Sequence, residues 1–125
     1  MGGLSARQIL WLFLRLNGRI SRAAYLLAGL LANLVPGFLL YRFTLAPVES
    51  QAADSWAVAF VLIGLLSVWS IFALSVKRVH DLGKPGPYAL ALFVPVISYV
   101  VFIVLCVMPG DPAPNRYGAE TNSPG

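Results

Sequence analysis

The stretch Lys77-Arg78-Val79-His80-Asp81-Leu82-Gly83-Lys84-Pro85-Gly86 lies between two long apolar segments and decides how the chain is arranged. It is the densest charged run in the chain, and it holds the one histidine, His80, beside Asp81. Basic residues suit the C-terminal end of a helix, and glycine followed by proline is typical of a helix that stops. We therefore expect a helix to end near Gly83 and the chain to turn there between two apolar segments.

The composition predicts one domain, residues 1–125, that is surrounded by lipid. The chain is 58% hydrophobic and 11% charged, with a mean hydropathy of +0.77, whereas soluble domains carry roughly 25% charged residues. The basic residues flank the apolar segments, so we expect them to face a membrane surface rather than nucleic acid. The short apolar run 9–14 lies between arginines with no small-residue cleavage site after it, so we do not expect a cleaved signal peptide.

Hydropathy predicts an all-α membrane protein with three transmembrane helices, an amphipathic N-terminal helix at the interface and an irregular C-terminal tail. The spans are expected over about 23–42, 56–76 and 87–108. The second span carries no charge and extends about 31 Å at ~1.5 Å per residue, close to the ~30 Å hydrocarbon core. Small residues at every third or fourth position predict close helix contacts, either within one chain or between copies. These residues are Ala24, Ala28, Ala32, Gly64, Ser67 and Ser70.

The third apolar segment contains Pro95, which leaves two topologies open. We expect a single kinked crossing over 87–108, because the residues before Pro95 are too few to cross a membrane on their own. The alternative is a re-entrant hairpin that turns near Pro95 and returns the tail to its starting side. The side on which the tail lies depends on this choice.

Both ends of the chain are expected to lie outside the spans. Residues 4–16 show an amphipathic helical pattern. Such a helix either lies in the headgroup region, with Trp11 and Phe13 directed inward, or packs on the protein's own bundle. The tail, 109–125, is rich in Pro, Gly, Asp and Asn, and we expect its last few residues to be disordered.

The charges near the spans predict the orientation. The side of the N-terminus has a net charge of +6, from Asp81 and seven basic residues: Arg7, Arg15, Arg19, Arg22, Lys77, Arg78 and Lys84. The other side has a net charge of −2, from two basic and four acidic residues: Arg42, Arg116, Glu49, Asp54, Asp111 and Glu120. We expect the basic side to be cytoplasmic, so the N-terminus and the Lys77–Gly86 turn lie inside. The tail lies outside if the third segment crosses once.

Three segments of the chain together resemble a known family. They are Gly18-Arg19-Ile20-Ser21-Arg22-Ala23-Ala24-Tyr25, the Lys77–Gly86 turn, and Pro109-Gly110 with Asn115-Arg116-Tyr117-Gly118. Their order and separation resemble the YhaH/YhaI-like family of small bacterial inner-membrane proteins, a domain of unknown function. The chain departs from the family pattern after the loop glycine, where Pro87-Tyr88 replaces an aromatic pair or tryptophan. The resemblance implies the bacterial inner membrane and no particular reaction.

The charged residues of these segments allow two interpretations. In the first, Arg78 and Asp81 form a local ion pair on one helix face that ends the second span. In the second, the arginines of the first two segments and Lys84 ring an anionic group such as a lipid phosphate. Asn115 and Arg116 fold the tail against the bundle end, or join the arginines if the third segment is a hairpin. The candidate polar cluster is Arg19, Arg22, Arg78, His80, Asp81, Lys84, Asn115 and Arg116.

The sequence shows no motif of an enzyme. HExxH, Gly-x-Ser-x-Gly and P-loop patterns are absent from it, and His80 with Asp81 offers two ligands where a catalytic zinc usually has three. We expect no catalytic, cofactor-binding or metal-binding residue. The expected function is that of a non-catalytic inner-membrane protein that contacts lipids, other membrane proteins or further copies of itself at a basic cytoplasmic face. The alternative is an oligomeric small-solute or lipid transporter, although no carboxylate lies within a span.

Overall fold

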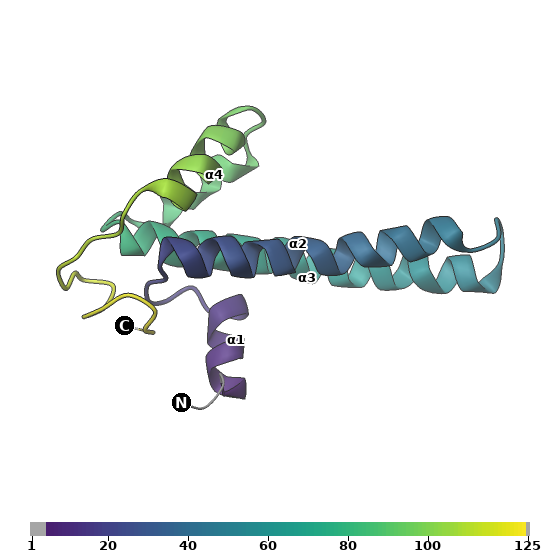
Figure 1. Ribbon diagram of the computed structural model, residues 1–125, viewed down its shortest axis with the longest axis horizontal. Coiled ribbons are helices and arrows are strands. Elements are labelled where there is room, and N and C mark those ends of the chain that lie inside the picture. Colours follow the sequence, from purple (N-terminus) through teal and green to yellow (C-terminus); the bar gives the residue numbers. More distant parts are fainter. Residues whose placement is uncertain (1–4, 125) are drawn as a thin grey trace.

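The structure, a computed structural model, describes residues 5–124. Its helices are α1 (Ala6–Leu14), α2 (Arg22–Leu45), α3 (Gln51–Asp81), the 3-10 helix η1 (Gly86–Phe93) and α4 (Ile97–Val107). Within these residues there are two isolated β-bridges and no strand, so the all-α prediction is confirmed. Figure 1 shows α2 and α3 side by side and antiparallel, with α1 to one side near one end of this pair and transverse to it, and the η1–α4 arm leaving from the same end.

Small residues form the contact between α2 and α3. Ala28 and Ala32 on α2 are buried, as are Ser67 and Ser70 on α3, so these four residues of the predicted seams lie inside one chain. The other two, Ala24 and Gly64, are only partly buried, and a Cβ at Gly64 would meet no atom within 4 Å. The outward faces are apolar, and Leu27, Leu34 and Leu65 are each 66% exposed. Of the described helices, α2 and α3 are long and apolar enough to cross a membrane.

Side-chain caps fix the starts of both long helices. The Ser21 hydroxyl accepts a hydrogen bond from the Ala24 N–H at 3.2 Å, so Ser21 is the N-cap of α2. The Ser50 hydroxyl accepts one from the Ala53 N–H at 3.0 Å at the start of α3. Both caps follow irregular backbone, so each long helix begins at a residue that satisfies its first free amides.

The helix α3 ends in the turn that the sequence predicts. Gly83 has a φ of 79°, in the left-handed region that glycine adopts without strain. Its N–H donates to the His80 carbonyl at 2.9 Å, and the Lys84 N–H donates to the Val79 carbonyl at 3.1 Å. These two bonds form a Schellman motif, which directs the chain away from the helix axis.

The segment expected to be one kinked crossing is a hairpin instead. Val94 is extended before Pro95, and α4 begins at Ile97 and returns toward the start of η1 (Figure 1). Proline disfavours helical backbone in the preceding residue, and Val96 has a φ of 71°, which reverses the chain. The 11 residues of α4 extend about 16 Å at ~1.5 Å per residue, about half of a membrane core. The third transmembrane helix predicted over 87–108 is therefore not confirmed, and a hairpin replaces it.

The hairpin brings the tail back to the end of the helix pair that carries the Lys77–Gly86 turn (Figure 1). The Arg19 N–H donates to the Ser123 carbonyl at 3.0 Å, and the Asn17 amide donates to the Pro124 carbonyl at 2.5 Å. The tail is irregular, as predicted, but these bonds hold it as far as Pro124, which corrects the expectation of disorder there; Gly125 lies outside the described residues. The tail was expected at the opposite end of the molecule only if the third segment crossed once. Because the chain reverses near Pro95, the tail lies instead at the end that holds the N-terminal helix α1.

The N-terminal helix is shorter than the 4–16 predicted for it, and Leu4 lies outside the described residues. Ser5 and Gln8 form a capping box, with reciprocal side-chain bonds of 3.2 and 2.8 Å. Trp11 and Phe13 pack partly buried against the core, whereas Leu10 is 56% exposed. The helix therefore packs on the bundle with one face and leaves an apolar edge outside it.

Candidate functional site

A carboxylate held between two arginines lies at the centre of the polar end of the molecule. Asp81 Oδ1 accepts from Arg19 Nε at 3.0 Å, and its Oδ2 accepts from Arg78 Nη1 at 2.6 Å. All three residues are at most 2% exposed. The predicted ion pair between Arg78 and Asp81 is present, and Arg19 adds a second cation from the other side. The anion that the two arginines surround is thus part of the chain itself.

The other donors of Arg19 bind the tail. Its Nη1 donates to the Ala113 carbonyl at 3.0 Å and the Gly118 carbonyl at 3.2 Å, and its Nη2 donates to the Asp111 carbonyl. A guanidinium has five N–H groups in a fixed plane, so one side chain can fix several carbonyls at once. Arg19 therefore holds the irregular tail in place between residues 111 and 118.

The other donors of Arg78 bind the end of the hairpin. Its Nε donates to the Leu105 carbonyl at 2.7 Å and its Nη2 donates to the Met108 carbonyl, both at the C-terminal end of α4. The last carbonyls of a helix have no partner within the helix and carry partial negative charge. Arg22 supplies a third bond there, from Nη1 to the Val107 carbonyl at 2.7 Å. Two arginines thus cap α4.

Lys77 has the same role at the C-terminal end of α1. Its ammonium donates to the carbonyls of Trp11 (2.7 Å), Leu12 (2.5 Å) and Arg15 (2.6 Å), and it lies 5.2 Å from the centroid of the Trp11 ring. An ammonium has three N–H groups, so its donors are all used. Trp69 adds a bond from Nε1 to the Leu14 carbonyl at 2.9 Å, which fixes the same helix end.

His80 is a packing residue in this arrangement. Its Nδ1 lies 2.9 Å from the Gly18 carbonyl, an acceptor, so Nδ1 carries the proton that makes this bond. Its ring stacks on Tyr117 with 3.9 Å between centroids and 2° between planes. The Asn115 amide donates to the His80 carbonyl at 3.1 Å, and the Arg116 guanidinium lies 4.9 Å from the Tyr117 ring centroid.

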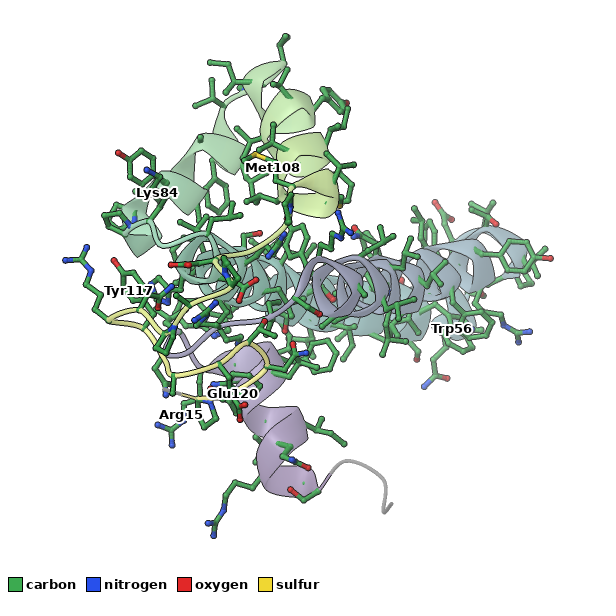
Figure 2. All side chains as sticks on the ribbon, turned by 60° about the vertical axis from the view of Figure 1, so that its left-hand side comes forward. Arg15, Trp56, Lys84, Met108, Tyr117 and Glu120 are labelled. Carbon is green, nitrogen blue, oxygen red and sulfur yellow. The ribbon has the colours of Figure 1, made fainter. Side chains whose placement is uncertain are left out.

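The structure brings together most of the candidate cluster, although not around a common empty centre. Arg19, Arg78 and Asp81 form one buried group, and His80 and Asn115 contact the tail beside it. Lys84 and Arg116 are exposed at the surface of the same end. Figure 2 shows Tyr117 and Glu120 on the tail, Arg15 at the same end of the molecule, and Trp56 far along the helix pair.

Three contributors to this end were not assigned by sequence reasoning. Lys77 is fully buried as the cap of α1, and Tyr117 stacks on the histidine. Gly110 lies so close to Asp81 that a Cβ there would overlap the carboxylate. Gly110 and Tyr117 belong to the tail motif, so their place in that motif was the available signal. Nothing in the sequence pairs Lys77 with α1, because its partners are backbone carbonyls.

Comparisons with known proteins agree with this grouping of the three motif segments. The family described as "Protein of unknown function (DUF805)" matches residues 13–119, which include all three. Inner membrane protein YhaI of Escherichia coli (strain K12) is 40% identical over 50 residues, 40% of this chain and 42% of that relative. Inner membrane protein YhaH of the same strain is 27% identical over 70 residues, 56% of this chain and 58% of that relative.

The chain spans about half the length of the curated relatives it matches. No solved structure matches it. The names of the relatives, with two long apolar helices in this chain, support an inner-membrane location. Because the family match extends over most of its residues and includes the whole polar cluster, the chain belongs to the DUF805 family of proteins of unknown function.

Proposed function

We propose that this chain is a non-catalytic, multi-pass protein of the bacterial inner membrane that acts through lipid or protein contacts at its basic, cytoplasmic end. The observation that carries the proposal is the division of the basic residues into two groups. Arg19, Lys77 and Arg78 are buried and bind the chain itself, whereas Arg7, Arg15, Lys84 and Arg116 are exposed at the same end. The exposed group takes part in no ion pair among the described residues and is available to anionic headgroups.

The distribution of charge supports a cytoplasmic position for this end. With the tail returned by the hairpin, the end holds eight basic and three acidic residues, a net charge of +5. The opposite end holds Arg42 against Glu49 and Asp54, a net charge of −1. Basic residues beside membrane spans favour the cytoplasm. The proposed topology has two crossings, by α2 and α3, and a hairpin that enters and leaves from the cytoplasmic side.

We predict that a cysteine in the tail will react only with reagents applied from the cytoplasm. The test uses Glu120→Cys in a Cys106→Ala background and a membrane-impermeant maleimide on inverted vesicles and on intact spheroplasts. Val48→Cys is the matched position at the other end, since Val48 is 91% exposed between α2 and α3. It should react only from the outside. Labelling of Glu120→Cys in intact spheroplasts would contradict this topology and support a third crossing.

We also predict that the exposed cations retain anionic lipid. Lys84→Gln/Arg116→Gln should hold phosphatidylglycerol about tenfold to thirtyfold more weakly, at ~1 kcal/mol per basic residue near a membrane. Native mass spectrometry from nanodiscs that contain phosphatidylglycerol and phosphatidylethanolamine measures the retained lipid. Arg42→Gln, at the opposite end, is the control and should leave retention unchanged. If Lys84→Gln/Arg116→Gln retains as much phosphatidylglycerol as Arg42→Gln, Lys84 and Arg116 have no role in lipid binding.

The runner-up, an oligomeric small-solute or lipid transporter, draws no support from the small-residue seams. Ala28, Ala32, Ser67 and Ser70 are buried between α2 and α3, so they are not available to join copies. The same mass spectra test the alternative, because a closed ring of several copies would favour the transporter and a monomer with bound lipid would favour the first proposal.

A further inference from the structure

A cavity of about 610 Å³ lies between α1, the first turn of α2 and the end of the tail. Its size falls in the ~300–1,000 Å³ range of small-molecule sites in proteins. One part of its lining is apolar and comes from Leu10, Trp11 and Leu12 on α1 and Ala24 on α2. The cavity is therefore suited to receive hydrocarbon as well as polar groups.

The charged part of the lining is entirely basic. Arg7 and Arg15 are its two charged residues, and both are exposed. Among the described residues, the ion pairs of this protein join Asp81 to Arg19 and to Arg78, and neither Arg7 nor Arg15 takes part. Two guanidinium groups without a carboxylate in the lining make the cavity complementary to an anion, and a guanidinium fork matches the geometry of a phosphate.

Both walls of the cavity are fixed by hydrogen bonds. The wall formed by α1 is held at its C-terminal end by the Lys77 ammonium and the Trp69 indole. The opposite wall is the tail, where Asn122 Oδ1 accepts from the Ser21 N–H at 2.9 Å and the Pro124 carbonyl accepts from the Asn17 amide. A cavity whose walls are held in place loses little conformational entropy when a ligand binds.

We infer that this cavity holds one anionic phospholipid of the cytoplasmic leaflet. Its phosphate would pair with Arg7 and Arg15, and the upper part of an acyl chain would contact the apolar lining. The inference rests on the proposed cytoplasmic position of this end. The helix α1 lies beside one end of the long helix pair and runs transverse to it (Figure 1), which puts the cavity at the level of the headgroups if α2 and α3 span the membrane. The lipid would join α1 to the tail and would be part of the assembled protein.

The experiment counts phosphatidylglycerol molecules that stay bound to the full chain in native mass spectrometry from nanodiscs. The wild type should retain one molecule tightly. Arg7→Gln/Arg15→Gln should bind it about tenfold or more weakly, because two charges near the headgroup are lost. Ala24→Phe fills the cavity without a change of charge and should remove the same molecule, which loose attraction to a basic surface would not require. Phosphatidylcholine should not replace it.

Three outcomes would overturn the inference. The first is a full complement of phosphatidylglycerol in both Arg7→Gln/Arg15→Gln and Ala24→Phe. The second is loss only in the charge variant, which indicates surface attraction without a site. The third is displacement of the lipid by millimolar glycerol phosphate, which indicates a soluble anion as the ligand. Melting temperatures of the variants, which are expected to match the wild type, show that the fold is intact.

The same spectra separate this inference from the proposed function. If Lys84→Gln/Arg116→Gln lowers retention while Arg7→Gln/Arg15→Gln does not, the cavity is not the site and the basic end still binds lipid. If no variant lowers retention, both proposals are wrong. Arg42→Gln is again the matched control, because it removes an exposed arginine at the opposite end.

Discussion

Asp81→Asn should unfold this protein at a much lower temperature than the wild type, with a loss of about 3–5 kcal/mol in the free energy of unfolding. The substitution keeps the shape of the side chain and removes its charge. Arg19 and Arg78 would then remain buried without their common carboxylate, at 1% and 0% exposure. A buried charge that loses its partner destabilises a fold far more than the loss of an exposed pair.

Thermal unfolding in detergent, followed by circular dichroism, measures this effect. Asp54→Asn is the control, because Asp54 is an exposed carboxylate in the first turn of the same helix, α3. Its loss should change stability by about 0.3–1 kcal/mol through the helix dipole. If the two variants unfold at the same temperature, Asp81 is not the centre that holds this end together.

Gly110→Ala should have the second largest effect, a loss of about 1–3 kcal/mol. A methyl group at this position would overlap the carboxylate of Asp81, and its Cβ would lie 3.2 Å from the Asp81 backbone carbonyl. The carboxylate is fixed by two arginines and cannot move aside without breaking an ion pair. The substitution is made in the tail, so the effect would show that the tail is part of the core of this end.

The control for Gly110→Ala is Gly64→Ala in α3, where a Cβ meets no atom within 4 Å. That change should be neutral or slightly stabilising, since alanine is the better helix former. A second comparison uses Asp81→Ala as the background, in which the carboxylate that overlaps the methyl group is absent. There the methyl group should cost less stability than in the wild type, and a loss as large as in the wild type would contradict contact between the Asp81 carboxylate and residue 110.

The two long helices could be predicted from the sequence because their signals are local. An uninterrupted apolar run, Ser21 as a cap and Gly83 at the end are each recognised within a few residues. The ion pair between Arg78 and Asp81 was predictable for the same reason, since its members lie one helical turn apart. The irregular structure of the tail was predictable as well, from its local content of Pro, Gly, Asp and Asn.

The third apolar segment could not be predicted in the same way. Hydropathy measures how apolar a segment is and contains no information on the direction of the chain. One long helix and a hairpin of the same residues therefore have the same hydropathy profile. Pro95 is compatible with a kink and with a turn, and the choice depends on the backbone of Val96. Charge counting assigned Arg116, Asp111 and Glu120 to the wrong end for this reason.

The partners of the buried cations were also beyond sequence reasoning. Lys77, Arg19 and Arg78 bind mainly backbone carbonyls, and every residue has one. A carbonyl becomes a good partner only when it is left free by the end of a helix or by an irregular segment. The sequence could show that basic residues gather at this end, but not that three of them are buried and bind the chain itself.

The contacts of Arg19 affect how the protein is made. Arg19 is synthesised early, and Asp81 and the carbonyls of residues 111–118 that satisfy it emerge much later. Until the ribosome has released residues 111–118, a guanidinium destined for burial lacks these partners, so this end must stay hydrated during insertion. This end of the fold therefore cannot close before residues 111–118 have been made, and a chain truncated before residue 111 would present a hydrated, incomplete end to the proteases that remove unfinished membrane proteins.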